Sequence, residues 1–187
     1  NFIYCKNLES VGMSQVRSIG ENVLYDCDKL EYVTLPKVVE IGNNSICDNA
    51  SLRYVDITSP ELSEISGIIN NNPSLESVII PEGVTSIGRI AFSSCASLAN
   101  VTIPSTVTSI NSNAFYNCKE LTSAPNDLFR NCNKVTTINF LFAGCDKLEN
   151  IKIEDEILEI IANNATSVKN NNIGFFNVFC FVHSKRI

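Results

Sequence analysis

A leucine recurs every 22 or 23 residues through roughly the first two thirds of this chain. The recurring leucines are Leu8, Leu30, Leu52, Leu75, Leu98 and Leu121. Each of the first five opens a hexapeptide whose first, fourth and sixth residues are apolar, as in Leu30-Glu-Tyr-Val33-Thr-Leu35. Such alternation is typical of a short β-strand with one buried face. A fixed period of this length predicts a solenoid, because one repeat can bury its apolar side only against its neighbours.

Two further columns of residues keep the same phase. One consists of apolar pairs three residues apart: Val16/Ile19, Val38/Ile41, Leu62/Ile65, Val84/Ile87, Val107/Ile110 and Ile157/Ile160. In the other, a large apolar residue precedes a Cys or Asn by three positions: Phe2/Cys5, Leu24/Cys27, Ile46/Asn49, Ile69/Asn72, Phe92/Cys95, Phe115/Cys118, Phe129/Cys132 and Phe142/Cys145. These columns predict stacked coils with short parallel strands on one face and turns, short strands or short helical pieces on the other.

The spacing of the repeat changes after Cys118. Cys118 and Cys132 are 14 residues apart, and Cys132 and Cys145 are 13 apart. We therefore expect about eight coils over residues 1–167, with those starting at Cys118 and Cys132 shortened. We interpret residues 168–187 as a segment that caps the last coil, or else as one that packs on a neighbour. Because the sequence starts partway through a repeat, we expect it to be a piece of a longer protein.

Glycine or asparagine follows the second member of several apolar pairs, at Gly20, Gly42, Gly88 and Asn111. Both residue types tolerate a left-handed backbone, so we expect a tight corner at these positions. The pattern is interrupted at Ser59-Pro60-Glu61. There we expect only a detail of a loop to change.

Several strings resemble a known family. Leu75-Glu-Ser-Val-Ile-Ile-Pro-Glu-Gly-Val-Thr-Ser-Ile-Gly88 and Ala91-Phe92-Ser-Ser-Cys95 are similar to the BspA-like leucine-rich repeat of the bacterial surface-antigen type. The resemblance extends over residues 2–165 and implies a leucine-rich-repeat solenoid. Members of this family are mostly large secreted or surface-anchored proteins of host-associated bacteria and some parasitic protists. The resemblance therefore implies a cell-surface or extracellular location and adhesion to a host or neighbouring-cell protein or glycan.

The eight cysteines do not have the spacing of a metal site, because no C-x-x-C pair occurs. Neighbouring rungs of a sheet are close enough for a disulfide, but side chains in one column point in parallel. Asn49 and Asn72 also occupy this column. We interpret it as a buried ladder of small side chains that bond to the backbone. Cys47 and Cys180 lie off the ladder, and we expect them to be the most reactive thiols.

Composition argues against several functions. The single histidine, His183, lies in the tail, so the repeats offer no Cys/His or Ser/His pair for nucleophilic catalysis. The net charge of −6 and the lack of a Lys/Arg cluster argue against nucleic-acid binding. The longest apolar run, 175–182, is too short to span a bilayer. We therefore expect a monomeric chain that is not an enzyme, holds no cofactor or metal, binds no nucleic acid and inserts no segment into a membrane.

The outward positions of the predicted strands are candidates for contact with a partner: Tyr32, Thr34, Tyr54, Asp56, Ser77, Ile79, Asn100 and Thr102. We expect Tyr32 and Tyr54 to be adjacent, with Asp56 and Ile79 beside them. Tyrosine is favoured at binding hot spots, although aromatic residues also stabilise strands by cross-strand pairing. Before these positions lies an acidic edge, which Arg53 interrupts, formed by Glu9, Glu31, Glu76 and Glu149.

These observations favour a non-catalytic protein-binding or adhesion module of a cell-surface or secreted protein, with its ligand on the strand face. The alternative is a structural spacer in a longer surface stalk that has no ligand of its own. The two hypotheses differ in whether the outward strand positions bind anything.

Overall fold

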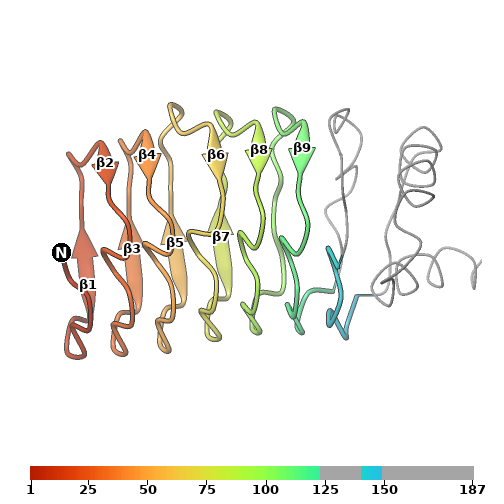
Figure 1. The fold of residues 1–187 in the computed structure, drawn as a ribbon, viewed down its shortest axis with the longest axis horizontal. Coiled ribbons are helices and arrows are strands. Elements are labelled where there is room, and N and C mark those ends of the chain that lie inside the picture. The colour runs from red at the N-terminus through yellow and green to blue at the C-terminus, as the bar shows by residue number, and fades with distance from the viewer. Residues whose placement is uncertain (123–139, 149–187) are drawn as a thin grey trace, which may run out of the picture.

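The computed structural model describes residues 1–122 and 140–148, and there the chain forms a stack of coils. Figure 1 shows the coils side by side along the long axis of the molecule, with two rows of strands on different sides of the stack. The described residues contain strands and turns and no helix. Of the predicted alternatives for the second side, short strands and turns are therefore the ones observed.

The first row of strands forms one parallel four-stranded sheet. Its members, in spatial order, are β1 (Ser10–Gly12), β3 (Tyr32–Thr34), β5 (Tyr54–Asp56) and β7 (Ser77–Ile79). The register pairs residues at equivalent positions of successive coils, such as Tyr32 with Tyr54. A parallel bridge from Ile79 to Thr102 continues the row into the next coil. The outward side of this sheet is called the front face below.

The second row is divided into two sheets. The strands β2 (Ser18–Ile19) and β4 (Glu40–Ile41) pair with each other, and β6 (Glu64–Ile65), β8 (Ser86–Ile87) and β9 (Ser109–Ile110) form a three-stranded sheet. The division falls between β4 and β6, where Ser59-Pro60-Glu61 lengthens the coil. Ile41 and Ile65 are 24 residues apart, against 22 for Ile19 and Ile41. The interruption therefore separates two sheets, which is more than the loop detail that was expected.

The added loop makes contacts of its own. Glu61 accepts a hydrogen bond from Arg17 at 2.6 Å, which ties two coils that are not neighbours in the stack. Pro60 lies so close to Gly83 that a Cβ atom at Gly83 would overlap the Pro60 carbonyl oxygen. Glycine is therefore required at position 83 by the close approach of two backbone segments.

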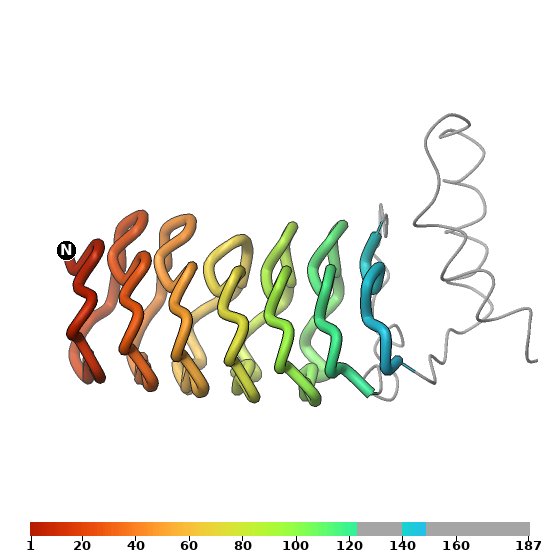
Figure 2. Tube along the Cα trace, turned by 90° about the horizontal axis from the view of Figure 1, so that it is seen from below, coloured from red at the N-terminus to blue at the C-terminus, as the bar shows by residue number. Residues whose placement is uncertain are grey.

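The three columns predicted from the sequence meet in one core. Leu30, Val33 and Leu35 of one hexapeptide are fully buried. Apolar residues of the other two columns, such as Val38 and Ile46, are buried in the same cluster. Figure 2 shows why: successive coils follow nearly superimposable paths, so equivalent residues stack along the axis. The prediction of a shared interior is confirmed for the described coils.

The corner at Phe115 lies directly against the corner at Phe142. Phe115 stacks on Phe142 with ring centroids 5.6 Å apart, and the Phe115 N–H bonds to the Leu141 carbonyl oxygen at 3.1 Å. The corner at Phe142 is thus the immediate neighbour of the corner at Phe115. The sequence predicts a further corner between them, at Phe129 and Cys132. Those two residues, and the predicted cap or tail at 168–187, lie outside the described residues, so the total of about eight coils stays a prediction.

Left-handed backbone occurs at the corners, but not at the predicted glycines. Asn22 and Asn44 have φ values of 54°. None of Gly20, Gly42, Gly88 and Asn111 has a positive φ itself, and the left-handed residue of each expected corner lies two positions later. Two of these glycines are required because a neighbouring segment approaches them too closely for a side chain. A Cβ at Gly42 would lie 2.6 Å from the backbone nitrogen of Glu21, and one at Gly88 would overlap the Ser66 side chain.

Candidate interaction face

The front face exposes large side chains beside small ones. Tyr32, Tyr54 and Ile79 have 41%, 40% and 54% of their surface exposed, whereas the intervening Val33 and Val55 are buried. Because successive side chains along a strand point to opposite sides, the buried valines direct their neighbours outward. The predicted adjacency of the two tyrosines is confirmed by their direct pairing in the sheet.

The remaining residues predicted for this face lie around the tyrosines. Asp56 pairs with Thr34 on one side and with Ile79 on the other. Ser77 pairs with Tyr54, and both Asn100 and Thr102 in the next coil are exposed. The fold thus brings all of the predicted positions together on one surface.

The edge of the front face carries a polar cluster that the sequence analysis missed. Arg53 donates to one carboxylate oxygen of Glu76 from Nε at 2.9 Å and from Nη2 at 2.7 Å. The Tyr54 hydroxyl donates to the other oxygen at 3.0 Å. The Arg53 guanidinium carbon lies 5.6 Å from the centre of the Tyr54 ring, within the range of a cation–π contact. These three residues are called the Arg53 cluster.

Electrostatics within the Arg53 cluster follow from these contacts. The pKa of Glu76 is lowered, first by the hydrogen bond from Arg53 and then by the one from Tyr54. The pKa of Arg53 is raised, mainly by its hydrogen bond to Glu76. The signal in the sequence was that Arg53 and Glu76 occupy the same position of consecutive coils, which makes them neighbours on the stack.

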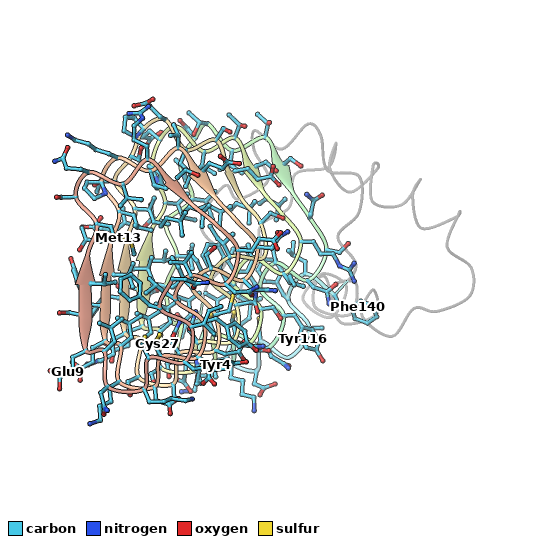
Figure 3. All side chains as sticks on the ribbon, turned by 60° about the vertical axis from the view of Figure 1, so that its left-hand side comes forward. Tyr4, Glu9, Met13, Cys27, Tyr116 and Phe140 are labelled. Atoms are coloured by element: carbon cyan, nitrogen blue, oxygen red, sulfur yellow. The ribbon has the colours of Figure 1, made fainter. Side chains whose placement is uncertain are left out.

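The acidic edge continues on the β1 side without such a partner. Glu9 and Glu31 are exposed and belong to consecutive coils, joined by a backbone hydrogen bond of 2.9 Å from Glu31 to Glu9. Among the residues that the structure describes, neither forms an ion pair. Figure 3 shows Glu9 and Met13 flanking β1 at the margin of the stack, and Cys27 between this strand and the corner at Tyr4.

Between its partly exposed ends at Cys5 and Cys145, the described part of the cysteine column is a buried hydrogen-bond ladder, as predicted. Cys95 and Cys118 have no exposed surface, and their thiols donate to the carbonyl oxygens of Ile69 and Phe92, both at 3.2 Å. Burial raises the pKa of Cys95 to about 12 and raises that of Cys118 as well. A thiol with so high a pKa holds little thiolate at neutral pH and is a poor nucleophile.

Cys47 does not have the reactivity expected of it. Its side chain is fully buried, its sulfur lies 3.8 Å from the Gly67 carbonyl oxygen, and burial raises its pKa to about 12. A position beside the ladder column is therefore as enclosed here as the column itself, and the expectation for Cys47 is wrong. Cys180 and His183 lie outside the described residues.

Among residues 1–122 and 140–148, no three His, Cys, Asp or Glu side chains are grouped as metal ligands would be. No helix in these ranges has the length and apolar character to cross a membrane.

The chain is similar to known repeat proteins. The family model described as "BspA type Leucine rich repeat region (6 copies)" matches residues 1–122 and 67–180. A leucine rich cell surface protein of Faecalibacterium prausnitzii A2-165 is 24% identical with a TM-score of 0.54, over 82% of this chain and 35% of that protein. A leucine-rich repeat protein of T. pallidum is 23% identical with a TM-score of 0.57, over 88% of this chain and 85% of that one. No protein of curated function matches the sequence.

The two solved structures share the fold of this chain, and the chain spans 35% of the first and 85% of the second. The match to the family model is broader, because its two ranges together reach from residue 1 to residue 180. This chain belongs to the family of BspA-type leucine-rich-repeat proteins.

Proposed function

We propose that this chain is a non-catalytic protein-interaction module of a cell-surface or secreted protein and that its partner binds on the front face. The observation that carries the proposal is the exposure of Tyr32, Tyr54 and Ile79 at neighbouring positions of one sheet. Contiguous large apolar side chains at a surface are typical of sites that a partner covers.

The tyrosines can stabilise the sheet by cross-strand pairing and still bind a partner. Tyr32 and Tyr54 pair across the sheet, yet about two fifths of each side chain stays exposed. A stiff aromatic side chain loses little conformational entropy on binding and offers both apolar area and a hydroxyl. The Arg53 cluster holds the Tyr54 hydroxyl in one orientation, which favours a preorganised surface.

Family membership supports the proposed location and the class of partner. Repeat solenoids of this kind present extended surfaces to other macromolecules, and one structural neighbour is described as a cell surface protein. The partner in this proposal is a host or neighbouring-cell protein or glycan. The raised pKa values of the buried thiols favour a non-catalytic role, since thiol catalysis needs an accessible thiolate.

The test uses the full chain, immobilised and exposed to a panel of purified surface proteins and glycans, with affinities measured by surface plasmon resonance. We expect the double variant Tyr32→Ala with Tyr54→Ala to bind the partner with an affinity lower by about tenfold or more. Tyr4→Ala is the matched control, because Tyr4 is 62% exposed and lies at a corner away from the front face.

Circular dichroism of each variant verifies that the solenoid stays folded. Equal affinities for the double variant and the wild type would show that the front face is not the binding surface. If the wild-type chain binds no member of the panel, the result favours the spacer hypothesis instead.

A further inference from the structure

The front face combines an aromatic pair with a hydrogen-bond acceptor. Tyr32 and Tyr54 pair in register, and Asp56 follows Tyr54 by two residues in β5. Because alternate residues of a strand point to the same side, the Asp56 side chain lies beside that of Tyr54. Flat apolar rings next to a carboxylate suit a ligand that carries both C–H groups and hydroxyl groups.

Asp56 has hydrogen-bonding capacity that the fold does not use. Its Oδ1 atom is enclosed and has no hydrogen-bond donor among the described residues. Enclosed polar atoms are normally paired, so a carboxylate in this state gains more from each donor that a ligand brings to its other oxygen. The side chain as a whole is only partly buried, so a ligand on the front face can reach it.

The charges on and around this face favour a neutral ligand. Among the outward residues of β1, β3, β5 and β7, Asp56 is the only charged one. The adjoining edge is acidic, since Glu9 and Glu31 are exposed there and the cation Arg53 is already bound to Glu76. An anionic ligand is therefore repelled, whereas a neutral ligand that donates hydrogen bonds is not.

The spacing of the stack matches an extended sugar chain. Neighbouring rungs of a sheet are about 4.8 Å apart, and Tyr32 and Tyr54 occupy consecutive rungs. The rings of an extended β-1,4-linked glycan repeat at a similar distance, so a chain along the stack axis (Figure 1) brings one sugar to each rung. An extended peptide advances about 3.3 Å per residue and falls out of step with the rungs.

We propose that the front face binds a neutral, extended glycan that runs across the strands along the axis of the stack. One sugar ring lies with its C–H groups against the Tyr32 ring, because these bonds carry partial positive charge and an aromatic face is negative. A hydroxyl group of the next sugar donates to the Asp56 carboxylate. This inference rests on the proposed function, whose binding face it shares, and narrows the partner to one chemical class.

Tyr32 is the stacking platform and Tyr54 is its neighbour. Arg53 already covers one face of the Tyr54 ring, whereas the Tyr32 ring makes no such contact in the described part of the chain. The Tyr54 hydroxyl donates to Glu76 and is thereby held in place. Tyr54 therefore borders the glycan as a fixed wall, while the Tyr32 ring offers its face.

The first experiment titrates the isotopically labelled full chain with three neutral β-1,4-linked hexasaccharides, cellohexaose, chitohexaose and mannohexaose, and records backbone amide resonances by NMR. We expect at least one of them to shift the amides of Tyr32, Tyr54 and Asp56 with a Kd of about 1 mM or lower. The same hexasaccharide oxidised to carboxylates at C6 is the matched ligand and should bind at least about tenfold more weakly. Binding of none of the three, or equal binding of the oxidised form, would overturn the inference.

The second experiment asks whether the aromatic face of Tyr32 is what the sugar contacts. Tyr32→Phe keeps this face and should leave the Kd within about twofold of the wild type. Tyr32→Leu keeps an apolar side chain without an aromatic face and should raise the Kd by about fivefold. Equal effects of the two substitutions would contradict stacking.

The third experiment compares two substitutions that remove the same charge. Asp56→Asn should raise the Kd for the hexasaccharide by about tenfold, because a hydrogen bond to a charged acceptor is replaced by a weaker one. Asp28→Asn is the matched control, because Asp28 pairs with Lys6 outside the front face, and it should leave the Kd nearly unchanged. Equal effects in both variants would contradict the assigned role of Asp56.

Failure of this inference is distinguishable from failure of the proposed function. A partner protein free of glycans that requires Tyr32 and Tyr54, together with no binding of the three hexasaccharides, would leave the interaction function standing and remove only the glycan. Circular dichroism of each variant verifies that a loss of binding does not reflect unfolding.

Discussion

Cys95 and Asn72 donate hydrogen bonds to the same acceptor, the carbonyl oxygen of Ile69, at 3.2 and 2.8 Å. The two donors occupy the same column in consecutive coils, so this oxygen is bonded both within its own coil and from the next. Asn72 also donates to the Ile46 carbonyl oxygen at 2.7 Å and accepts from the Asn49 N–H at 3.0 Å. An asparagine in this column therefore makes three hydrogen bonds that join its own coil to the preceding one, whereas a cysteine contributes a donor alone.

The first prediction concerns this difference between asparagine and cysteine. Asn72→Ala leaves the buried Ile46 carbonyl oxygen and the Asn49 N–H without these partners, and should lower the free energy of unfolding by about 2–4 kcal/mol. Cys95→Ala should cost about 1–2 kcal/mol, because Ile69 keeps its bond from Asn72. Guanidinium denaturation followed by circular dichroism measures both. Equal losses would show that the extra bonds of Asn72 contribute nothing.

The second prediction concerns thiol reactivity. Iodoacetamide at pH 8 should modify Cys47 and Cys95 at least about tenfold more slowly in the folded chain than in denaturant, because burial disfavours the thiolate. Mass spectrometry of the digested protein measures each site. Cys5 is partly exposed and provides the internal comparison. Rapid labelling of Cys95 under native conditions would contradict the buried ladder.

The third prediction concerns alkaline pH. Burial raises the pKa of Cys95 from the ordinary value of 9.0 to about 12 in the folded chain. Such a thiol contributes stability that is fully present below pH 9 and is lost as the pH rises from 9 toward 12, because the unfolded chain releases the proton first. The free energy of unfolding should therefore fall across this window.

Its control is Cys95→Ala, which lacks the titrating group and should show a shallower decline between pH 9 and 12. Denaturation curves measured at intervals across this range supply the comparison for both proteins. If the two slopes were identical, the Cys95 thiol would not be responsible for the loss.

The fourth prediction concerns the close approach of Pro60 to Gly83. In Gly83→Ala, the new Cβ would overlap the Pro60 carbonyl oxygen, so the lengthened coil must shift. We expect a loss of about 1–3 kcal/mol, as for other overpacked sites. Gly20→Ala is the matched control, because a Cβ there meets nothing within 4 Å. Thermal denaturation that ranks the control as the less stable variant would contradict this account.

Much of the interaction face followed from the sequence, because strand alternation is a local property. Once Leu30 and Val33 point inward, Tyr32 must point outward, and the 22-residue period sets it beside Tyr54. The Arg53 cluster did not follow in the same way. A period shows that Arg53 and Glu76 occupy neighbouring rungs, but rotamers and distances decide whether their side chains bond.

By itself, the sequence determined the repeat, the division into inward and outward residues and the hydrogen-bonding ladder of Cys and Asn. These features recur in every coil, and identical neighbours make identical contacts, so a periodic pattern is enough to predict them. The tertiary structure alone decided where the coils differ. It placed Phe142 directly on Phe115, enclosed Cys47 and separated β4 from β6. Each of these depends on how coils of unequal length fit against one another, and no single repeat contains that information.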